Sequence, residues 1–336
     1  MSTPIPPGKL PALLLRELLA AGPPLPPEVR LGPRIGEDAC AIDVAAGTLV
    51  AATDPITLTG SDVGAHAVVI NANDVAVMGV RPRWFLAVVL LPEGTREQQV
   101  RALFASMREA LARTGTALVG GHTEVTSAVA QPVVVGQMLG LAENGAVVRS
   151  GGAQVGDALV QAGAAPVEGA AVLAEEARQQ LDTLDLATLA RASDALENPG
   201  ISVVEPALLA AELGASALHD PTEGGLAAGL AELAEASGVR LRVDGERVLW
   251  FEPGRSVCRA LGADPWATLA SGTLLATFPA ERAAAACDAL EKSGTQARVI
   301  GAAEPGAGVV LADGRPLPLP ARDEVARLLS RPGVRS

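Results

Sequence analysis

Apolar residues at helical spacing alternate along the chain with shorter, strand-like apolar runs. One predicted helix, residues 60–79 with the sequence GSDVGAHAVVINANDVAVMG, has an unusual polar side. On a helical wheel Asn71, Asn73 and Asp74 fall on that side, and mainly small apolar residues fall on the other. The polar side carries no Lys, Arg or Glu, which solvated helix faces usually have. The pattern therefore favours a polar face directed into a site over a merely solvated face.

The rest of the first half predicts strands separated by helices. The predicted strands are 48–53, 84–91, 117–119 and 132–141, and a second helix covers 96–113. Asp54 directly follows the first of these strands, and GGHTE, residues 120–124, follows the third as a predicted turn. We therefore expect an α+β fold in which helices pack against a sheet.

Near residue 150 the residue pattern changes, because a Gly-rich stretch precedes a new apolar strand. We place a domain boundary there, with an N-terminal domain over 1–150 and a C-terminal domain over 151–336. The second half again mixes strand and helix patterns, which predicts a mixed α/β sandwich. Its segment HDPTEGG, residues 219–225, leads into a helix that ends near Ser237.

Composition and charge narrow the class of protein. The 336 residues suffice for two ordinary domains, and 49% apolar with 19% charged residues fits a globular protein. The formal net charge of -12 disfavours nucleic acid as a partner. No apolar run is long enough to span a membrane and the N-terminus lacks a signal-peptide pattern, so we expect a cytoplasmic protein. Cys40, Cys258 and Cys287 are isolated, and we expect them to be reduced, buried thiols.

Lone acidic residues recur beside apolar segments without neighbouring Lys or Arg. They are Asp38 in GEDA, Asp54 after a strand, Asp74 on the polar helix and Asp220 in HDPTEGG. Each one alone can be explained by a structural role, since Asp is common in turns and helix caps. Together, hard oxygen ligands of this kind suit Mg²⁺, which usually shares its shell with waters and substrate phosphates.

Glycine pairs offer a second kind of phosphate contact. Gly120-Gly121 leaves a predicted strand and Gly224-Gly225 opens a predicted helix, so we expect free backbone N–H groups there. The motif GxxxxGK[ST] is absent, which excludes a P-loop protein. No GxGxxG follows a strand and GxSxG is absent, which disfavours a dinucleotide fold and the simplest hydrolase.

The three histidines show no metal-ligand spacing. His66 lies on the apolar side of the first helix and is expected to be a packed or capping residue. For His122 a phosphate contact and a structural hydrogen bond stay open, and for Glu124 a site residue and a surface residue. His219 stands beside Asp220 and is placed to orient that carboxylate.

The order of these motifs resembles one known group of proteins. GEDA, TD, NANDVAVMGVRP, GGHTE, GAQVGDALVQAG and HDPTEGGLA occur in the order seen in the aminoimidazole ribonucleotide synthetase (PurM) superfamily. Its members include that purine enzyme, thiamine-monophosphate kinase, selenophosphate synthetase and the hydrogenase maturation protein HypE. HDPTEGGLA, EGAAVLAEE and CRALGADPWATLASGTLLATF are most similar to HypE segments. The resemblance extends over residues 35–302.

The resemblance implies a two-domain PurM-like fold that binds ATP with Mg²⁺ and forms a homodimer through its N-terminal sheets. The metal ligands that it implies are Asp38, Asp54, Asp74 and Asp220. The nucleotide contacts that it implies are Asn71, Asn73, Gly120, Gly121, Thr123 and Gly224. The candidate catalytic residues are Asp74, Asp220 and His122.

Two features differ from HypE proteins. HypE proteins end in a cysteine that receives a carbamoyl group, whereas this sequence ends RPGVRS. Either the sequence stops short of that cysteine, or this relative uses another acceptor. Glu223 stands where HypE has Arg, and an acid there would repel a phosphate rather than bind it.

The leading hypothesis is an ATP-dependent enzyme of the HypE-like branch. Mg²⁺-assisted phosphoryl transfer would activate an amide or carbonyl oxygen of a small-molecule or carrier-protein substrate. A small-molecule kinase of the thiamine-monophosphate kinase type is the second hypothesis. The third is a non-catalytic assembly protein whose nucleotide gates a partner interface. A role in hydrogenase maturation follows only from the resemblance, and the residues do not name the acceptor.

Overall fold

The computed structural model describes residues 29–31, 36, 40–44, 47–57 and 62–330. The candidate metal ligand Asp38 lies outside the described residues. The described residues form two compact units: residues 29–31, 40–44, 47–57 and 62–147 make up one, and residues 36 and 148–330 make up the other. The N-terminal unit contains β1 to β6 with α2 and α3, and the C-terminal unit contains the elements from η1 (Ser150–Gly152) onward.

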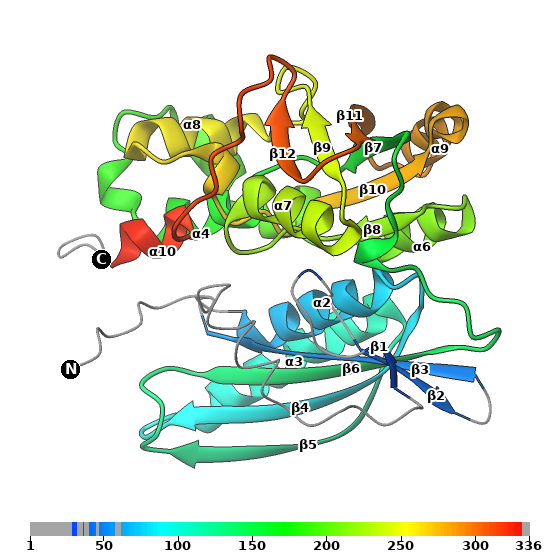
Figure 1. The fold of residues 1–336 in the computed structure, drawn as a ribbon. Coiled ribbons are helices and arrows are strands. Elements are labelled where there is room, and N and C mark those ends of the chain that lie inside the picture. The colour runs from blue at the N-terminus through cyan, green and yellow to red at the C-terminus, as the bar shows by residue number, and fades with distance from the viewer. Residues whose placement is uncertain (1–28, 32–35, 37–39, 45–46, 58–61, 331–336) are drawn as a thin grey trace, which may run out of the picture. The chain divides into compact units, whose positions relative to one another are not determined.

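One mixed sheet forms the base of the N-terminal unit. Its strands are β1 (Val29–Leu31), β2 (Cys40–Val44), β3 (Gly47–Ile56), β4 (Pro82–Pro92), β5 (Ala117–Thr126) and β6 (Val133–Ala142). They form a six-stranded sheet in the order β1-β2-β3-β6-β4-β5. Neighbouring strands are antiparallel except β4 and β5, which run parallel. The helices α2 (Val63–Ala76) and α3 (Glu97–Thr114) cover one face of this sheet (Figure 1).

The opposite face of the sheet is apolar but carries no helix among the described residues of this unit. Along β4, buried Phe85 and Val89 alternate with half-buried Leu86, Val88 and Leu90. Because successive side chains of a strand point to opposite faces, the buried set faces the helices and the half-buried set faces away. The unit therefore presents an apolar sheet face on its helix-free side.

Strand β3 is longer than the sequence predicts. It continues through Asp54 and Pro55 to Ile56, and Asp54 pairs with Gly136 of β6. In the described residues β2 pairs with β3 only as far as Ala51, so the next residues of β3 have one open edge. Proline has no N–H to donate and is tolerated on such an edge. Asp54 thus lies within a strand rather than after it.

The predicted turn at residues 120–124 is wrong, because these residues belong to strand β5. The strand pairs in parallel with β4 from Ala117 to Thr126. Gly121 has a φ of 146°, and a Cβ at this position would lie 2.0 Å from the Ala87 carbonyl oxygen. Only a glycine allows such a close approach of the two backbones. At Gly121 the glycine that looks like a turn residue therefore serves strand pairing.

A second mixed sheet forms the centre of the C-terminal unit. Its strands are β7 (Asp157–Ala162), β8 (Ala217–His219), β9 (Arg240–Val243), β10 (Leu274–Pro279), β11 (Ala297–Glu304) and β12 (Gly308–Leu311). The order is β12-β9-β11-β7-β10-β8, with only β12 and β9 parallel. The helices are α4 (Glu168–Glu176), α5 (Leu186–Ser193), α6 (Val204–Glu212), α7 (Gly225–Ser237), α8 (Glu252–Leu261), α9 (Ala280–Lys292) and α10 (Glu324–Leu329). Short helical turns are η2 (Arg178–Gln180), η3 (Leu196–Gly200) and η4 (Pro265–Ala267).

Helices cover both faces of this second sheet at its centre. Every residue of β7 is buried, which is typical of a strand enclosed on both sides. Leu159 of β7 and Leu275 of β10 share one core cluster with Leu226 and Leu230 of α7. The helix α9 packs against β7, β10 and β11, and α6 packs against β8 and β10. The expected α+β fold with a mixed α/β second half is confirmed.

None of the helices in the described residues is both long enough and apolar enough to cross a membrane.

Candidate functional site

Asn71 ties the polar side of α2 to strand β3. Its side chain is fully buried, and its Oδ1 accepts the Asp54 N–H at 2.8 Å. Its Nδ2 donates to the carbonyl oxygens of Asp54 at 3.2 Å and of Ala67 at 2.8 Å. A Cβ on Gly136 would lie 2.3 Å from this nitrogen, so the glycine leaves the space that Asn71 needs. Asn71 therefore fixes the backbone of Asp54, and its amide is used inside the unit instead of facing a nucleotide.

Asp74 is the one residue of the predicted polar face that reaches the surface of the described structure. Asn73 is fully buried like Asn71, whereas Asp74 is partly exposed. The helix contacts α3 on one side and β3 and β6 on the other, so most of its surface is interior. The expectation of an open polar face along the helix is wrong. Asp54 and Asp74 nevertheless both lie next to Asn71. Asp54 is hydrogen-bonded to Asn71, and Asp74 follows Asn71 by about one helical turn.

His66 is buried on the same helix, and its Nδ1 lies 3.0 Å from the Asp62 carbonyl oxygen. This agrees with a packed or capping residue.

His122 and Glu124 lie on the exposed edge strand β5. Their side chains are 61% and 49% exposed, and His122 Nε2 lies 3.4 Å from Glu124 Oε2. Residues two apart on a strand share a face, which explains the contact. Gly120 and Thr123 are exposed on the same strand. An exposed pair of this kind adds little stability because solvent screens it.

Asp220 lies in the candidate segment HDPTEGG of the C-terminal unit. It directly follows β8, and it is 2% exposed. His219 is just as buried, and its Nε2 lies 3.0 Å from Glu232 Oε2 on α7. The structure thus gives His219 a carboxylate partner on α7 that the sequence does not predict. Glu223 is partly exposed in the same segment.

Gly224 and Gly225 form the left-handed turn that opens α7, with φ values of 83° and 65°. A Cβ on Gly225 would lie 2.5 Å from the Trp266 carbonyl oxygen, so no larger residue fits. The Gly225 N–H donates to the Thr222 carbonyl at 3.1 Å, and the Gly224 N–H donates to Asp323 Oδ2 at 2.7 Å. The expectation that these N–H groups are free for a phosphate is therefore wrong.

Asp323 is a buried acid that sequence analysis does not single out. Its Oδ1 accepts the Val325 N–H at 2.7 Å and its Oδ2 accepts the Gly224 N–H. Burial raises its pKa to about 7, although the two hydrogen bonds act to lower the pKa. The nearby carboxylate of Glu223 contributes to this rise in the pKa. In the sequence, the available signal is an Asp placed just before a short helix, which is typical of an N-cap.

The acidic residues have the chemistry of a magnesium site. Asp54 and Asp74 belong to the N-terminal unit and Asp220 to the C-terminal unit. Among the described residues, no group of three His, Cys, Asp or Glu side chains is placed to hold a metal ion. Mg²⁺ needs only one or two carboxylates where substrate phosphates complete its shell. Carboxylate oxygens of this kind therefore suit a magnesium ion that is bound together with phosphates.

The two cysteine side chains that the structure describes are poor nucleophiles. Cys258 is buried with its Sγ 3.4 Å from Thr268 Oγ1, and burial raises its pKa to about 11. Burial likewise raises the pKa of Cys287, which is partly buried. Because the thiolate is the reactive form, neither thiol is activated at neutral pH. Both are unpaired, as expected for reduced thiols.

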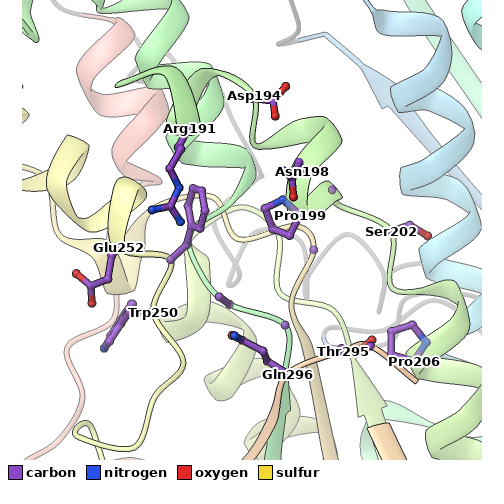
Figure 2. A pocket seen from close by; sticks show the side chains of 16 residues that line it. Arg191, Asp194, Asn198, Pro199, Ser202, Pro206, Trp250, Glu252, Thr295 and Gln296 are labelled. Atoms are coloured by element: carbon purple, nitrogen blue, oxygen red, sulfur yellow. The ribbon is translucent and has the colours of Figure 1, made fainter. Parts of the chain in front are cut away.

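A cavity of about 600 Å³ lies in the C-terminal unit (Figure 2). It is lined by the loop after β7, the segment from α5 to α6, and the residues before α8, β10 and β11. Trp250 and Phe251 supply apolar surface, and Arg191, Asn198 and Gln296 supply polar groups. Its size is typical of small-molecule sites. The sequence does not predict it because five separate segments contribute to the lining.

The cavity wall is held by Gln161, which is fully buried on β7. Its Oε1 accepts the Leu249 N–H at 3.0 Å, and its Nε2 donates to the Leu249 carbonyl at 2.9 Å. The cavity wall is also connected to the HDPTEGG segment. The Ala270 N–H donates to the Thr222 carbonyl at 3.2 Å, and Ala270 lies two positions before the cavity residue Gly272. Walls fixed by buried hydrogen bonds make a preformed pocket.

Family models and curated relatives match most of the chain. The model of the AIR synthase related protein N-terminal domain matches residues 36–142, and that of the C-terminal domain matches residues 154–314. Carbamoyl dehydratase HypE of Rhizobium leguminosarum bv. viciae is 30% identical over 277 residues, which cover 80% of this chain and 77% of that protein. The protein of the same name from Cupriavidus necator is 30% identical over 292 residues, 84% of this chain and 79% of that protein.

A solved structure extends the agreement to the fold. The crystal structure of hydrogenase maturation protein HypE in complex with ATP matches with a TM-score of 0.71 and 27% identity. The match covers 88% of this chain and 92% of that chain. Sequence and fold therefore agree over both units. The chain belongs to the AIR synthase-related family, in which its relatives are hydrogenase maturation proteins of the HypE type.

Proposed function

We propose that this chain is an ATP-dependent enzyme of the HypE-like branch that transfers the γ-phosphoryl group of ATP to an amide or carbonyl oxygen. The observation that carries the proposal is the likeness, over 88% of the chain, to a HypE structure in complex with ATP. Two relatives at 30% identity are named carbamoyl dehydratases, which supports an amide-like acceptor. The transfer would form a phosphorus–oxygen bond to the acceptor and break the β–γ bond, with ADP as the leaving group. Loss of the phosphate would complete a dehydration.

In this proposal residues 1–150 form the domain that binds ATP with Mg²⁺, and residues 151–336 form the second domain. The proposed metal ligands are Asp38, Asp54, Asp74 and Asp220. A magnesium ion there would neutralise phosphate charge during transfer. Asn71 acts indirectly, since its hydrogen bonds hold Asp54 in place before the phosphates arrive. The exposed edge strand β5, with Gly120, Gly121, His122 and Thr123, stays the candidate nucleotide surface.

We place the acceptor in the cavity of the C-terminal unit. Figure 2 shows Arg191 extending toward Trp250, while the carboxylate of Asp194 points away from Arg191. Guanidinium and amide groups suit an acceptor with a carboxylate or amide, and the aromatic surface suits its apolar part. The hydrogen bond between Ala270 and Thr222 supports this placement, because it links the cavity wall to the segment that contains Asp220.

We also propose a homodimer that forms through the helix-free face and edge of the N-terminal sheet. Leu118, Val119 and Val125 of β5 are 42%, 53% and 56% exposed, which is unusual for large apolar side chains on an edge strand. The half-buried apolar residues of β4 form the helix-free face beside this edge, whereas Leu118 and Val125 pair with the buried residues Phe85 and Leu91 and so belong to the edge alone. ATP as the substrate supports a cytoplasmic location.

A product analysis tests the reaction and separates it from the alternatives. The protein is incubated with ATP, Mg²⁺ and a panel of primary amides and an S-carbamoylated peptide. We expect ADP, inorganic phosphate and a product that has lost one water, detected by phosphorus NMR and mass spectrometry. A stable product that has gained a phosphate would instead identify a small-molecule kinase. Tight ATP binding with neither product would favour a non-catalytic assembly protein.

A further inference from the structure

A carboxylate far along the chain holds the turn that opens α7. The Gly224 N–H donates to Asp323 Oδ2 at 2.7 Å across 99 positions of sequence. Asp220 and Glu223 belong to the same segment as this glycine turn, so the shape of the turn sets where their carboxylates lie. A bond that fixes the turn therefore also acts on these two acids.

Asp323 is itself anchored by helix α10. Its second oxygen accepts the Val325 N–H at 2.7 Å and so caps that helix. Val325 and Leu328 are buried, and α10 packs beside α4 (Figure 1). Arg327 adds a hydrogen bond from its Nη2 to the Gly262 carbonyl at 3.1 Å. One carboxylate thus joins the first turn of α7 to the first turn of α10, with one oxygen for each.

Burial separates Asp323 from an ordinary helix cap of the same chain. Asp185 caps α5 with its Oδ1 2.8 Å from the Thr188 nitrogen, and it is exposed. Its hydrogen bonds with Thr188 lower its pKa. Asp323 is only 7% exposed, and burial raises its pKa to about 7. Capping a short helix does not require a buried acid beside Glu223, so the geometry indicates a second role.

We propose that Asp323 is a positioning residue of the ATP site that holds the turn from Thr222 to Gly225 in the shape that Asp220 needs. The assignment rests on the function proposed above. Helix α10 thereby becomes part of the support of the site. Because Asp323 already uses the Gly224 N–H, the phosphates are expected to contact other groups.

Two substitutions separate positioning from capping. Asp323→Asn keeps the size of the side chain but turns one accepting oxygen into a donor, so one of the two bonds is lost. Asp323→Ser keeps a good N-cap for α10 but is too short to reach both helices. Asp185→Asn changes the exposed cap of α5 in the same chemical way and is the matched control. ATP affinity with Mg²⁺ is measured by calorimetry, and hydrogen exchange of the Gly224 amide by NMR.

We expect both Asp323 variants to bind ATP at least about tenfold more weakly, and the Gly224 amide to exchange at least about tenfold faster in Asp323→Ser, with the control like the wild type. Folded Asp323 variants with wild-type ATP affinity would show a merely structural cap and overturn the proposal. If neither variant folds, hydrogen exchange in the wild type tests the proposal. ATP with Mg²⁺ should slow exchange of the Gly224 amide, and an unchanged rate overturns the proposal. A wild type that does not bind ATP would overturn the proposed function as well.

Discussion

Asn71 shows how one buried side chain positions an acid on another element. Its side chain makes hydrogen bonds with three backbone groups, two of them of Asp54, 17 positions earlier in the chain. The sequence places Asn71 on the polar side of a helix, which is correct. It does not show that the amide faces the neighbouring strand, because that depends on the packing of α2 against β3 and on the space left by Gly136. A polar residue on an apolar helix can therefore either hold a neighbouring strand through buried hydrogen bonds or form part of a binding face.

Replacing Asn71 tests this structural role. Asn71→Ala would leave the Asp54 N–H and C=O without their side-chain partner, so we expect the free energy of unfolding to fall by about 2–3 kcal/mol in urea denaturation. Asn144→Ala is the matched control, since the exposed Asn144 accepts the Ala146 N–H at 3.0 Å. The control should lose less than about 1 kcal/mol. Equal losses of unfolding free energy in the two variants would contradict the proposed structural role of Asn71.

The pKa of Asp323 predicts how stability depends on pH. Burial raises it from 3.8 to about 7 in the folded protein, so the folded state keeps a proton that the unfolded state has lost between these values. The free energy of unfolding should therefore fall as pH rises from 4 to 7. The contribution of this group is at most about 4 kcal/mol.

Asp323→Asn isolates this contribution because asparagine does not titrate. Urea denaturation at several pH values should show the decline from acid to neutral pH in the wild type and a flatter curve in the variant. The difference between the two curves removes the effects of other titrating groups. Parallel curves would show that Asp323 does not carry the raised pKa.

At the scale of elements, strand β5 differs most from its prediction. The sequence shows an apolar strand of three residues followed by GGHTE, and two adjacent glycines normally indicate a turn. The structure uses Gly121 for close pairing with β4 instead, and the strand runs on to Thr126. Helices are predicted well because their hydrophobic pattern arises from local spacing. The helix predicted over residues 96–113, for example, is observed over Glu97–Thr114. Strand ends depend on partners that are distant in sequence.

The exposed side of β5 also gives a prediction about assembly. If the homodimer forms there, Val119→Glu and Val125→Glu should place like charges at the interface and dissociate it. Val155→Glu is the control, because Val155 is 57% exposed, close to the 53% and 56% of the two test positions, but lies in the C-terminal unit. Sedimentation should show wild type and control at the mass of two chains and both β5 variants at the mass of one. Dimeric β5 variants, or a monomeric wild type, would contradict the proposed interface.

At the scale of the whole molecule, the two-domain fold and the family follow from the sequence, because the ordered motifs extend over both halves. The parts of the candidate site that the sequence misses are long-range: the bond between Asp323 and Gly224, the contact between His219 and Glu232, and the cavity held by Gln161. Each of them joins segments whose proximity only the folded chain reveals. The acids themselves stand out in the sequence because they lie among apolar residues without neighbouring bases.

The central claim is that these acids bind ATP through Mg²⁺, and calorimetric titration of ATP tests it most directly. The wild type should bind ATP tightly with Mg²⁺ and at least about tenfold more weakly when EDTA removes the metal. Asp54→Asn and Asp74→Asn should each weaken the Mg²⁺-dependent affinity at least about tenfold, and the exposed cap variant Asp185→Asn should not. Wild-type affinity in both the Asp54 and the Asp74 variant would contradict the account.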